Sequence, residues 1–147
     1  MSATEAPSQL PSSVWIRGGE RAPARARRYL LSQLDGDTSA LRAAEAALIA
    51  SELVTNSVVH ANVGTDDLLM LEVTALGDHL RIAVIDPGSE LEPRIRRGDP
   101  EMPGGFGLCL VERLSSAWGV ERGPSGNTRV WCELRLHGQD RQREEAR

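Results

Sequence analysis

The sequence predicts an α+β fold, a two-layer sandwich in which a mixed, mostly antiparallel sheet is covered on one face by helices. Two observations carry this prediction. Helical patterns and extended runs follow one another in the order β α α β β α β β. In addition, the links inside the two expected hairpins are too short for a parallel crossover. The order of the strands within the sheet does not follow from the sequence.

The N-terminal part begins with a segment that has little to bury. Residues 1–12 are rich in Ser, Pro and Ala and predict a tail, which a single domain over 13–137 and a polar tail over 138–147 follow. The apolar run 14–16 predicts a short strand, for which a sheet edge is one option. Residues 20–34 show helical spacing, with a proline in the first turn, and predict the first helix.

The middle of the chain predicts a long helix and a hairpin. Residues 39–61 are rich in Ala and Leu and contain neither Gly nor Pro, and Thr38 or Ser39 can cap the helix that this composition favours. Two extended runs follow, at 68–75 and 80–85, and their short link predicts an antiparallel pair. The second run alternates imperfectly, so we expect it in the centre of the sheet.

The C-terminal part predicts a long loop, a helix and a closing hairpin. Residues 86–103 are rich in proline and charge, which indicates an irregular loop. A glycine cluster then opens a helix over about 104–117. Its apolar side chains share one face: Leu108, Val111 and Leu114. The runs 118–121 and 128–136 predict two strands about a Gly-rich turn.

The long helix carries polar groups among its apolar side chains. At about 100° per residue, five apolar side chains fall within a sector of about 140°. These are Leu41, Leu48, Ile49, Leu53 and Val59. Glu52 and Asn56 lie inside that sector, where an unpaired carboxylate costs several kcal/mol unless a ligand, metal or water satisfies it. This pattern indicates a site, although hydrogen bonds to neighbouring backbone are an equal alternative.

The spacing of the polar groups suggests what such a site could do. Glu52, Asn56 and His60 are four residues apart and stack along one helix face. A carboxylate can act as a general base, and an Asn carbonyl oxygen suits Mg²⁺. A histidine near a helix C-terminus can equally be a partner of the helix dipole.

Two further motifs have the chemistry of a nucleotide site. Asp86 ends the run 80–85 and precedes Pro87 and Gly88, so its carboxylate lies where it could accept a hydrogen bond from an exocyclic amine such as that of adenine. An ordinary turn is the alternative. The cluster at 104–107 offers unobstructed amides before a helix, as a phosphate cradle requires, but turns and helix caps use glycine as well.

Composition excludes several classes of protein. With 21 acidic and 17 basic residues, the net charge of −4 argues against a dedicated nucleic-acid binder. The chain has no lysine, so cationic phosphate contacts must come from arginine. Cys109 and Cys132 lie in apolar contexts typical of reduced thiols, without excluding a disulfide. No apolar run is long enough for a membrane span or a signal peptide, and we expect a cytoplasmic protein without a membrane partner.

The motifs in their order resemble the GHKL superfamily of ATPases and kinases. They are ELVTN with His60, then DPG, then GGFGL, then GNTRVWCEL. Within this superfamily, residues 14–136 look most like the bacterial anti-sigma-factor serine/threonine kinases. The resemblance implies a histidine-kinase-like ATPase fold and the cofactors ATP and Mg²⁺.

The resemblance also implies roles for residues of the long helix and of the strand that follows. Glu52 would be the base that activates a hydroxyl or water, and Asn56 would be the Mg²⁺ ligand. Asp86 would accept from the adenine amine, supported by the turn at Gly88.

The same resemblance assigns the remaining contacts to the C-terminal half. Gly105, Gly107 and Leu108 would contact phosphates through backbone amides, Thr128 would sit near the adenine end, and the loop 89–103 would form a lid. Where relatives often have lysine before the last strand, this chain has Asn127, which brings no charge. Arginines of the lid could compensate, or they could belong to a solvated loop.

Two functions are consistent with such a pocket. The resemblance implies an anti-sigma-type protein serine/threonine kinase that regulates transcription through a sigma factor or an anti-sigma-factor antagonist. The alternative is a regulatory module that binds nucleotide and sequesters its partner without phosphotransfer. Neither needs direct contact with nucleic acid. The oligomeric state stays open, with a homodimer as one option.

Overall fold

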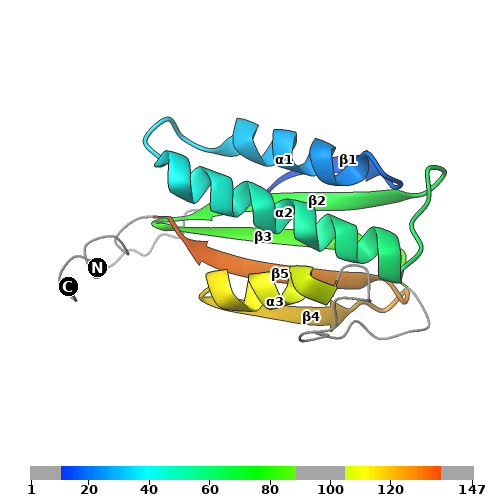
Figure 1. Cartoon of the computed structure of the whole chain (residues 1–147). Helices are drawn as coiled ribbons and strands as arrows, with labels where there is room; N and C mark the ends of the chain where they lie inside the picture. The colour runs from blue at the N-terminus through cyan, green and yellow to red at the C-terminus, as the bar shows by residue number, and fades with distance from the viewer. Residues whose placement is uncertain (1–10, 89–104, 137–147) are drawn as a thin grey trace.

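The computed structural model describes residues 11–88 and 105–136, which form three helices on one face of a five-stranded sheet (Figure 1). The elements in chain order are β1 (Ser12–Arg17), α1 (Ala22–Gln33), α2 (Ala40–His60), β2 (Leu68–Leu76), β3 (His79–Asp86), α3 (Gly105–Leu114), β4 (Ala117–Arg122) and β5 (Thr128–Arg135). The strand order is β1-β2-β3-β5-β4, and each neighbouring pair is antiparallel. The predicted fold class is therefore confirmed.

The strands occupy the positions in the sheet that their sequence patterns predict. β1 lies at an edge, and β3 is the central strand. In β3, Ala83 is buried along with the inward-facing Ile82 and Val84, which explains the imperfect alternation of this run. β5 alternates strictly between buried and half-buried residues, as expected for a strand with one face on the core. Both predicted hairpins, β2–β3 and β4–β5, are present.

The long helix α2 begins at one of the two capping residues that the sequence predicts. Ser39 has extended backbone angles, and its hydroxyl oxygen accepts a hydrogen bond from the Arg42 amide at 3.2 Å. This bond satisfies one of the amides that have no partner inside the helix. At the other end, Asn62 adopts a left-handed backbone with φ of 54° and turns the chain towards β2.

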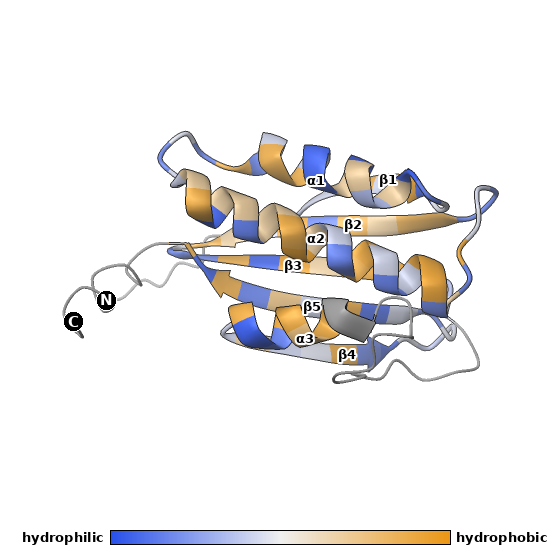
Figure 2. Ribbon diagram, viewed as in Figure 1, coloured by the Kyte–Doolittle hydropathy of each residue, from blue (hydrophilic) through white to orange (hydrophobic). Residues whose placement is uncertain are grey.

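The buried face of α2 differs from the predicted apolar sector. Leu41, Leu48 and Val59 are exposed by 56%, 40% and 41%. Because α2 packs between α1 and α3 over β3, small residues that allow close approach occupy much of its buried face. The core residues of this face are Ala46, Ala47, Ile49, Ala50, Leu53 and Val54. Figure 2 shows that hydrophobic and hydrophilic residues alternate along the whole of α2. Some of its hydrophobic residues are exposed, so the hydropathy of a residue in α2 does not by itself tell whether it lies in the core.

The predicted C-terminal boundary of the third helix was wrong. We expected a helix to about residue 117, but α3 ends at Leu114, and Ala117 already belongs to β4. The Ser116 amide donates to the Glu133 carbonyl of β5 at 2.8 Å, so the chain joins the sheet there. Strand pairing with β5 thus ends the helix. The predicted loop 89–103 and both predicted tails fall largely or wholly outside the described residues.

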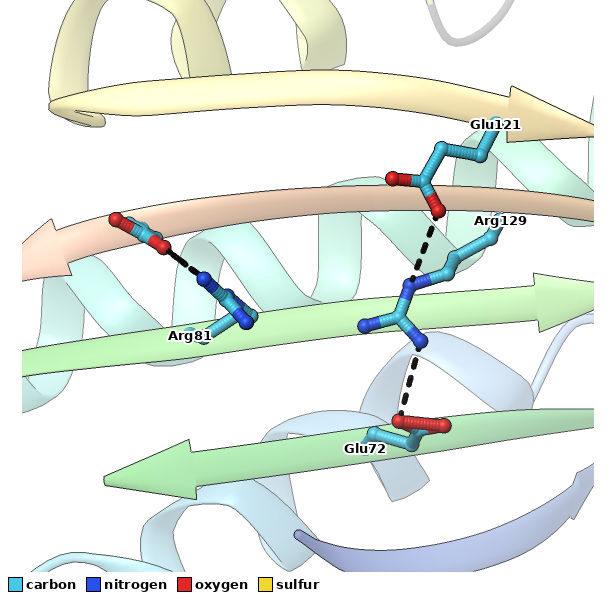
Figure 3. Close-up of polar contacts among 5 residues, drawn as sticks. Glu72, Arg81, Glu121 and Arg129 are labelled. Carbon is cyan, nitrogen blue, oxygen red and sulfur yellow. Dashed lines mark hydrogen bonds and ion pairs between the residues drawn. The ribbon is translucent and has the colours of Figure 1, made fainter. Parts of the chain in front are cut away.

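The sheet face away from the helices carries a network of charges (Figure 3). Arg129 of β5 contacts Glu72 of β2 at 3.4 Å and Glu121 of β4 at 4.0 Å, and Arg81 of β3 donates to Glu133 of β5. Such partly exposed pairs contribute about 0–1 kcal/mol each. Their contribution to the stability of the fold is therefore small. No helix in the described part of the chain is long and apolar enough to cross a membrane.

Two leucines of α2 provide a test of its buried face. Leu53 is fully buried, whereas Leu48 is 40% exposed. We expect Leu53→Ala to lower the free energy of unfolding by about 2–5 kcal/mol, because it leaves a cavity in the core. Leu48→Ala, the matched control, should change it by less than about 0.5 kcal/mol. Urea denaturation measures both, and equal losses would contradict the observed orientation of α2.

Candidate functional site

Asn56 of α2 has a buried side-chain oxygen without a hydrogen-bond partner in the described part of the chain. The residue is 3% exposed, and its Oδ1 accepts no hydrogen bond from any described residue. The neighbouring Ser57 hydroxyl is in the same situation. An unsatisfied buried polar atom costs about 1–3 kcal/mol. The predicted alternative, a bond to neighbouring backbone, is therefore absent for Asn56 Oδ1, and a ligand or ion that coordinates this oxygen would remove the cost.

Glu52 lies one helical turn before Asn56, at the border of the buried face. It is half-buried, not enclosed within the core as the predicted sector implied. Burial raises the pKa of the Glu52 carboxyl above its ordinary value of 4.5, and the nearby Arg27 guanidinium opposes this rise. Desolvation disfavours the charged form, which makes the carboxylate a stronger proton acceptor. This is the property that a general base requires.

Arg27 is a neighbour of this site that sequence reasoning missed. It belongs to α1, and its charge acts on Glu52 of α2. No local spacing links two residues on different helices, so only the packing of α1 against α2 reveals the relation. His60, the third residue of the predicted stack, is the last residue of α2 and half-buried. Its position also suits the alternative role as a partner of the helix dipole.

Asp86 is held at the end of the central strand with one carboxylate oxygen engaged. It is 5% exposed, and its Oδ1 accepts a hydrogen bond from the Gly88 amide at 2.7 Å. Within the described residues Oδ2 makes no hydrogen bond, so it can still accept one from a ligand. Thr128, the first residue of β5, pairs with Asp86 and is 3% exposed. The sheet therefore brings these two predicted site residues together.

The geometry of the turn after β3 requires a glycine at position 88. Its φ of +90° is rarely adopted by residues with a side chain, and a Cβ would lie 2.0 Å from the Gly126 carbonyl oxygen. The chain after β3 thus passes directly against the turn before β5. The ordinary-turn alternative for Asp86 is partly correct, because a turn is present. That turn leaves the second carboxylate oxygen free of hydrogen bonds among the described residues.

The predicted phosphate contacts lie at the start of α3. The helix begins at Gly105, so the amides of Gly105, Gly107 and Leu108 are among the first four, which have no intrahelical acceptor. The Leu108 side chain is 2% exposed and anchors this turn in the core. A helix N-terminus with free amides favours an anion. Gly104 lies outside the described residues.

The fold brings these elements to one end of the sheet. Figure 1 shows the last turns of α2, the end of β3 and the start of β5 at the same end. α2 packs against both β3 and α3. Oxygen acceptors on α2 and β3 therefore share one end of the domain. Such an arrangement can hold a ligand that has a hydrogen-bond donor at one end and an anion at the other.

Asn127, at the position where a lysine was expected, belongs to the β4–β5 turn. Its carbonyl oxygen accepts from the Gly123 amide at 2.8 Å, and its side-chain Oδ1 accepts from the Ser125 hydroxyl at 3.3 Å. A Cβ on Gly123 would lie 2.0 Å from that Oδ1. The side chain thus stabilises the turn and supplies no positive charge for a phosphate.

The donor set is compatible with Mg²⁺ held jointly by protein and ligand. Among residues 11–88 and 105–136, no three His, Cys, Asp or Glu side chains lie close enough to hold a metal ion by themselves. Mg²⁺ usually takes one or two protein oxygens and completes its shell with phosphates and water. The unpartnered Asn56 Oδ1 fits the protein share of that shell.

The comparison with known protein families gives the class of protein to which this fold belongs. The model of the histidine kinase-like ATPase domain family matches residues 20–131, from just before α1 into β5. The chain therefore belongs to this family, which confirms the predicted superfamily and fold. No curated protein matches the chain at a significant level. The family does not test the individual residue roles, which stay predictions.

The raised pKa of Glu52 makes a prediction about stability. Because this pKa is higher in the folded protein, the folded state binds the proton more tightly, and stability falls as the pH rises above about 4.5. We expect Glu52→Gln to be more stable than the wild type at pH ~7. At a pH well below the ordinary carboxyl pKa of 4.5, the two proteins should be equally stable. The exposed Glu20 provides a control, Glu20→Gln. Melting temperatures measured across this pH range test the prediction. A Glu52→Gln variant that is less stable than the wild type at neutral pH would contradict the raised pKa of Glu52.

Proposed function

We propose that this protein is an ATP- and Mg²⁺-dependent protein serine/threonine kinase of the anti-sigma type, which regulates transcription through a sigma factor or an anti-sigma-factor antagonist. One observation carries the proposal. The half-buried Glu52, with its raised pKa, lies one turn from a buried Asn56 oxygen that has no hydrogen-bond partner among the described residues. A proton acceptor and a metal ligand on one helix face are what transfer of a phosphoryl group to a hydroxyl requires.

Several residues of the site would bind the nucleotide and Mg²⁺. Asp86 Oδ2 would accept a hydrogen bond from the adenine amine, close to the buried Thr128. The first amides of α3 would hold phosphate oxygens. Asn56 Oδ1 would be the protein ligand of Mg²⁺, which neutralises phosphate charge when bound. These contacts position the nucleotide, and positioning is the main source of catalysis in phosphoryl transfer.

Glu52 would carry out the proton transfer. A serine hydroxyl of the partner attacks the γ-phosphorus of ATP, and its proton passes to the Glu52 carboxylate. The bond between the γ-phosphorus and the bridging oxygen breaks, so that ADP leaves and phosphoserine forms. A carboxylate with a raised pKa accepts that proton more readily than an exposed one.

A second function is favoured by one specific observation. Asn127 is neutral and engaged in its turn, so the position at which relatives often have lysine brings no charge to the phosphates. A domain that binds nucleotide and sequesters its partner without phosphotransfer is consistent with this loss. Both functions use the same pocket. They differ only in whether Glu52 acts as a base.

Glu52→Gln separates the two functions. The amide keeps the shape of the side chain but cannot accept the proton, so transfer should fall by a factor on the order of 10² to 10⁴ while ATP affinity persists. Radiolabelled ATP and small proteins encoded beside its gene serve as substrates. Glu121→Gln, on the opposite face of the sheet, is the control. Wild-type transfer by Glu52→Gln, or nucleotide-dependent partner binding without phosphoserine in the wild type, would support the binding module instead.

Asn56 and Asp86 should affect different properties of nucleotide binding. Asn56→Ala removes the orphaned oxygen, so we expect ATP affinity to lose its dependence on Mg²⁺ while the fold stays intact. Asp86→Ala should instead lose the preference for ATP over GTP and keep the Mg²⁺ dependence. Calorimetric titrations of ATP and GTP, with and without Mg²⁺, measure both. An unchanged magnesium titration in Asn56→Ala would remove its assignment as the ligand.

A further inference from the structure

A group of arginines at the start of α1 stands out against the acidic composition of the chain. Residues 17–28 contain five arginines and one glutamate, a net charge of +4 in a chain of net charge −4. Arg21, Arg25 and Arg28 recur at helical spacing on one exposed side of α1, and Arg17 ends β1 beside them. We call Arg17, Arg21, Arg25 and Arg28 the α1 arginine surface.

These arginines differ from those of the sheet because none of them has an acidic partner among the described residues. Arg81 and Arg129 each pair with a carboxylate on the open sheet face. Within the described residues, no carboxylate lies within 4.0 Å of any member of the α1 arginine surface. The Arg17 guanidinium donates to the Thr65 carbonyl at 3.3 Å. The surface therefore carries uncompensated positive charge, which attracts an anionic partner.

The α1 arginine surface borders a cavity. The cavity has a volume of about 270 Å³. It is lined by Arg17, Gly18, Glu20, Arg21, Arg25 and Thr65. Three of these six residues are members of the surface, and Glu20 supplies the only carboxylate of the lining among the described residues. The cavity can thus receive an acidic side chain between guanidinium groups.

Backbone contacts hold the wall of this cavity in place. The Gly18 amide donates to the Asp67 carbonyl at 3.0 Å, and the Gly19 amide donates to the Val63 carbonyl at 3.2 Å. A Cβ on Gly18 would lie 2.3 Å from the Val63 carbonyl oxygen, so the end of β1 fits directly against the loop that follows α2. A preformed wall lowers the entropy cost of binding.

We propose that the α1 arginine surface is a docking site for an acidic segment of a partner protein. Guanidinium groups bind carboxylates in a bidentate manner, and arginine is enriched at protein interfaces. A nucleic acid fits less well, because its affinity grows with an extended run of cations, and the remainder of this chain is acidic. That the partner is a protein rests on the proposed function.

The location of the surface gives the docked segment a route to the candidate site. Figure 1 shows that α1 begins at the end of the sheet where α2 and β3 end. Arg27, on the same helix, acts on Glu52. A partner held on α1 would therefore lie at the same end of the domain as the proposed base, which raises the effective concentration of its hydroxyl there.

Peptide binding without nucleotide tests this proposal independently of phosphotransfer. The probes are a fluorescein-labelled peptide that alternates glutamate and glycine, its glutamine counterpart, and an oligothymidine of the same length. We expect the glutamate peptide to bind and to weaken with salt. Arg21→Glu/Arg25→Glu should lower its affinity by about tenfold or more, because like charges then face each other. Arg113→Glu, an exposed arginine on α3, is the control and should bind as the wild type does.

Three results would overturn the docking site. They are equal peptide affinity in the wild type and the double variant, equal binding of the glutamine peptide, and a preference for the oligothymidine that depends on Arg21 and Arg25. Both arginines are exposed, so the variant should fold, and its melting temperature checks this. Arg21→Gln/Arg25→Gln, which removes charge without reversing it, should give an intermediate loss. Loss of peptide binding with intact phosphotransfer, or the reverse, distinguishes the two proposals.

Discussion

Burial of one side of α2 against β3, α1 and α3 is the interaction on which the rest of the structure depends. The helix is long, and its core side is made largely of alanine with Ile49, Leu53 and Val54 at the points of deepest contact. Small residues let the helix approach its neighbours closely, and close packing determines the helix rotation. That rotation places Asn56 inside and Glu52 at the border. The site is therefore a consequence of how the core packs.

The same packing makes the site costly in the absence of ligand. Asn56 Oδ1 and Ser57 Oγ are buried without partners among the described residues, and Glu52 is partly desolvated. Each of these features opposes folding by an amount that hydrophobic burial elsewhere must offset. Such local costs are common at functional sites, where a ligand removes them. The turn at Asp86 is different, because the Gly88 amide already satisfies one oxygen and fixes the direction of the other.

Charge is distributed unevenly over this domain. On the open sheet face, Arg81 and Arg129 are matched by carboxylates of other strands. On the helical side, the α1 arginine surface has no such match in the described part of the chain. The arginines of the sheet are neutralised by their carboxylates, whereas the charge of the α1 arginine surface can attract an anionic partner. The family assignment concerns the domain as a whole, and the arginine surface is a separate property of this chain.

The sequence by itself determined the elements and their type. Helical periodicity, the cap at Ser39 and the short hairpin links are local signals, and the structure bears out each of them. Motif order also predicted the family that residues 20–131 define. Tertiary structure alone decided the buried face of α2, where Leu48 is exposed and Ala50 is buried, and the early end of α3 at Leu114. It also decided the strand order and the approach of Arg27 to Glu52. These features depend on contacts between residues far apart in the chain, and such contacts leave no periodic signal in the sequence.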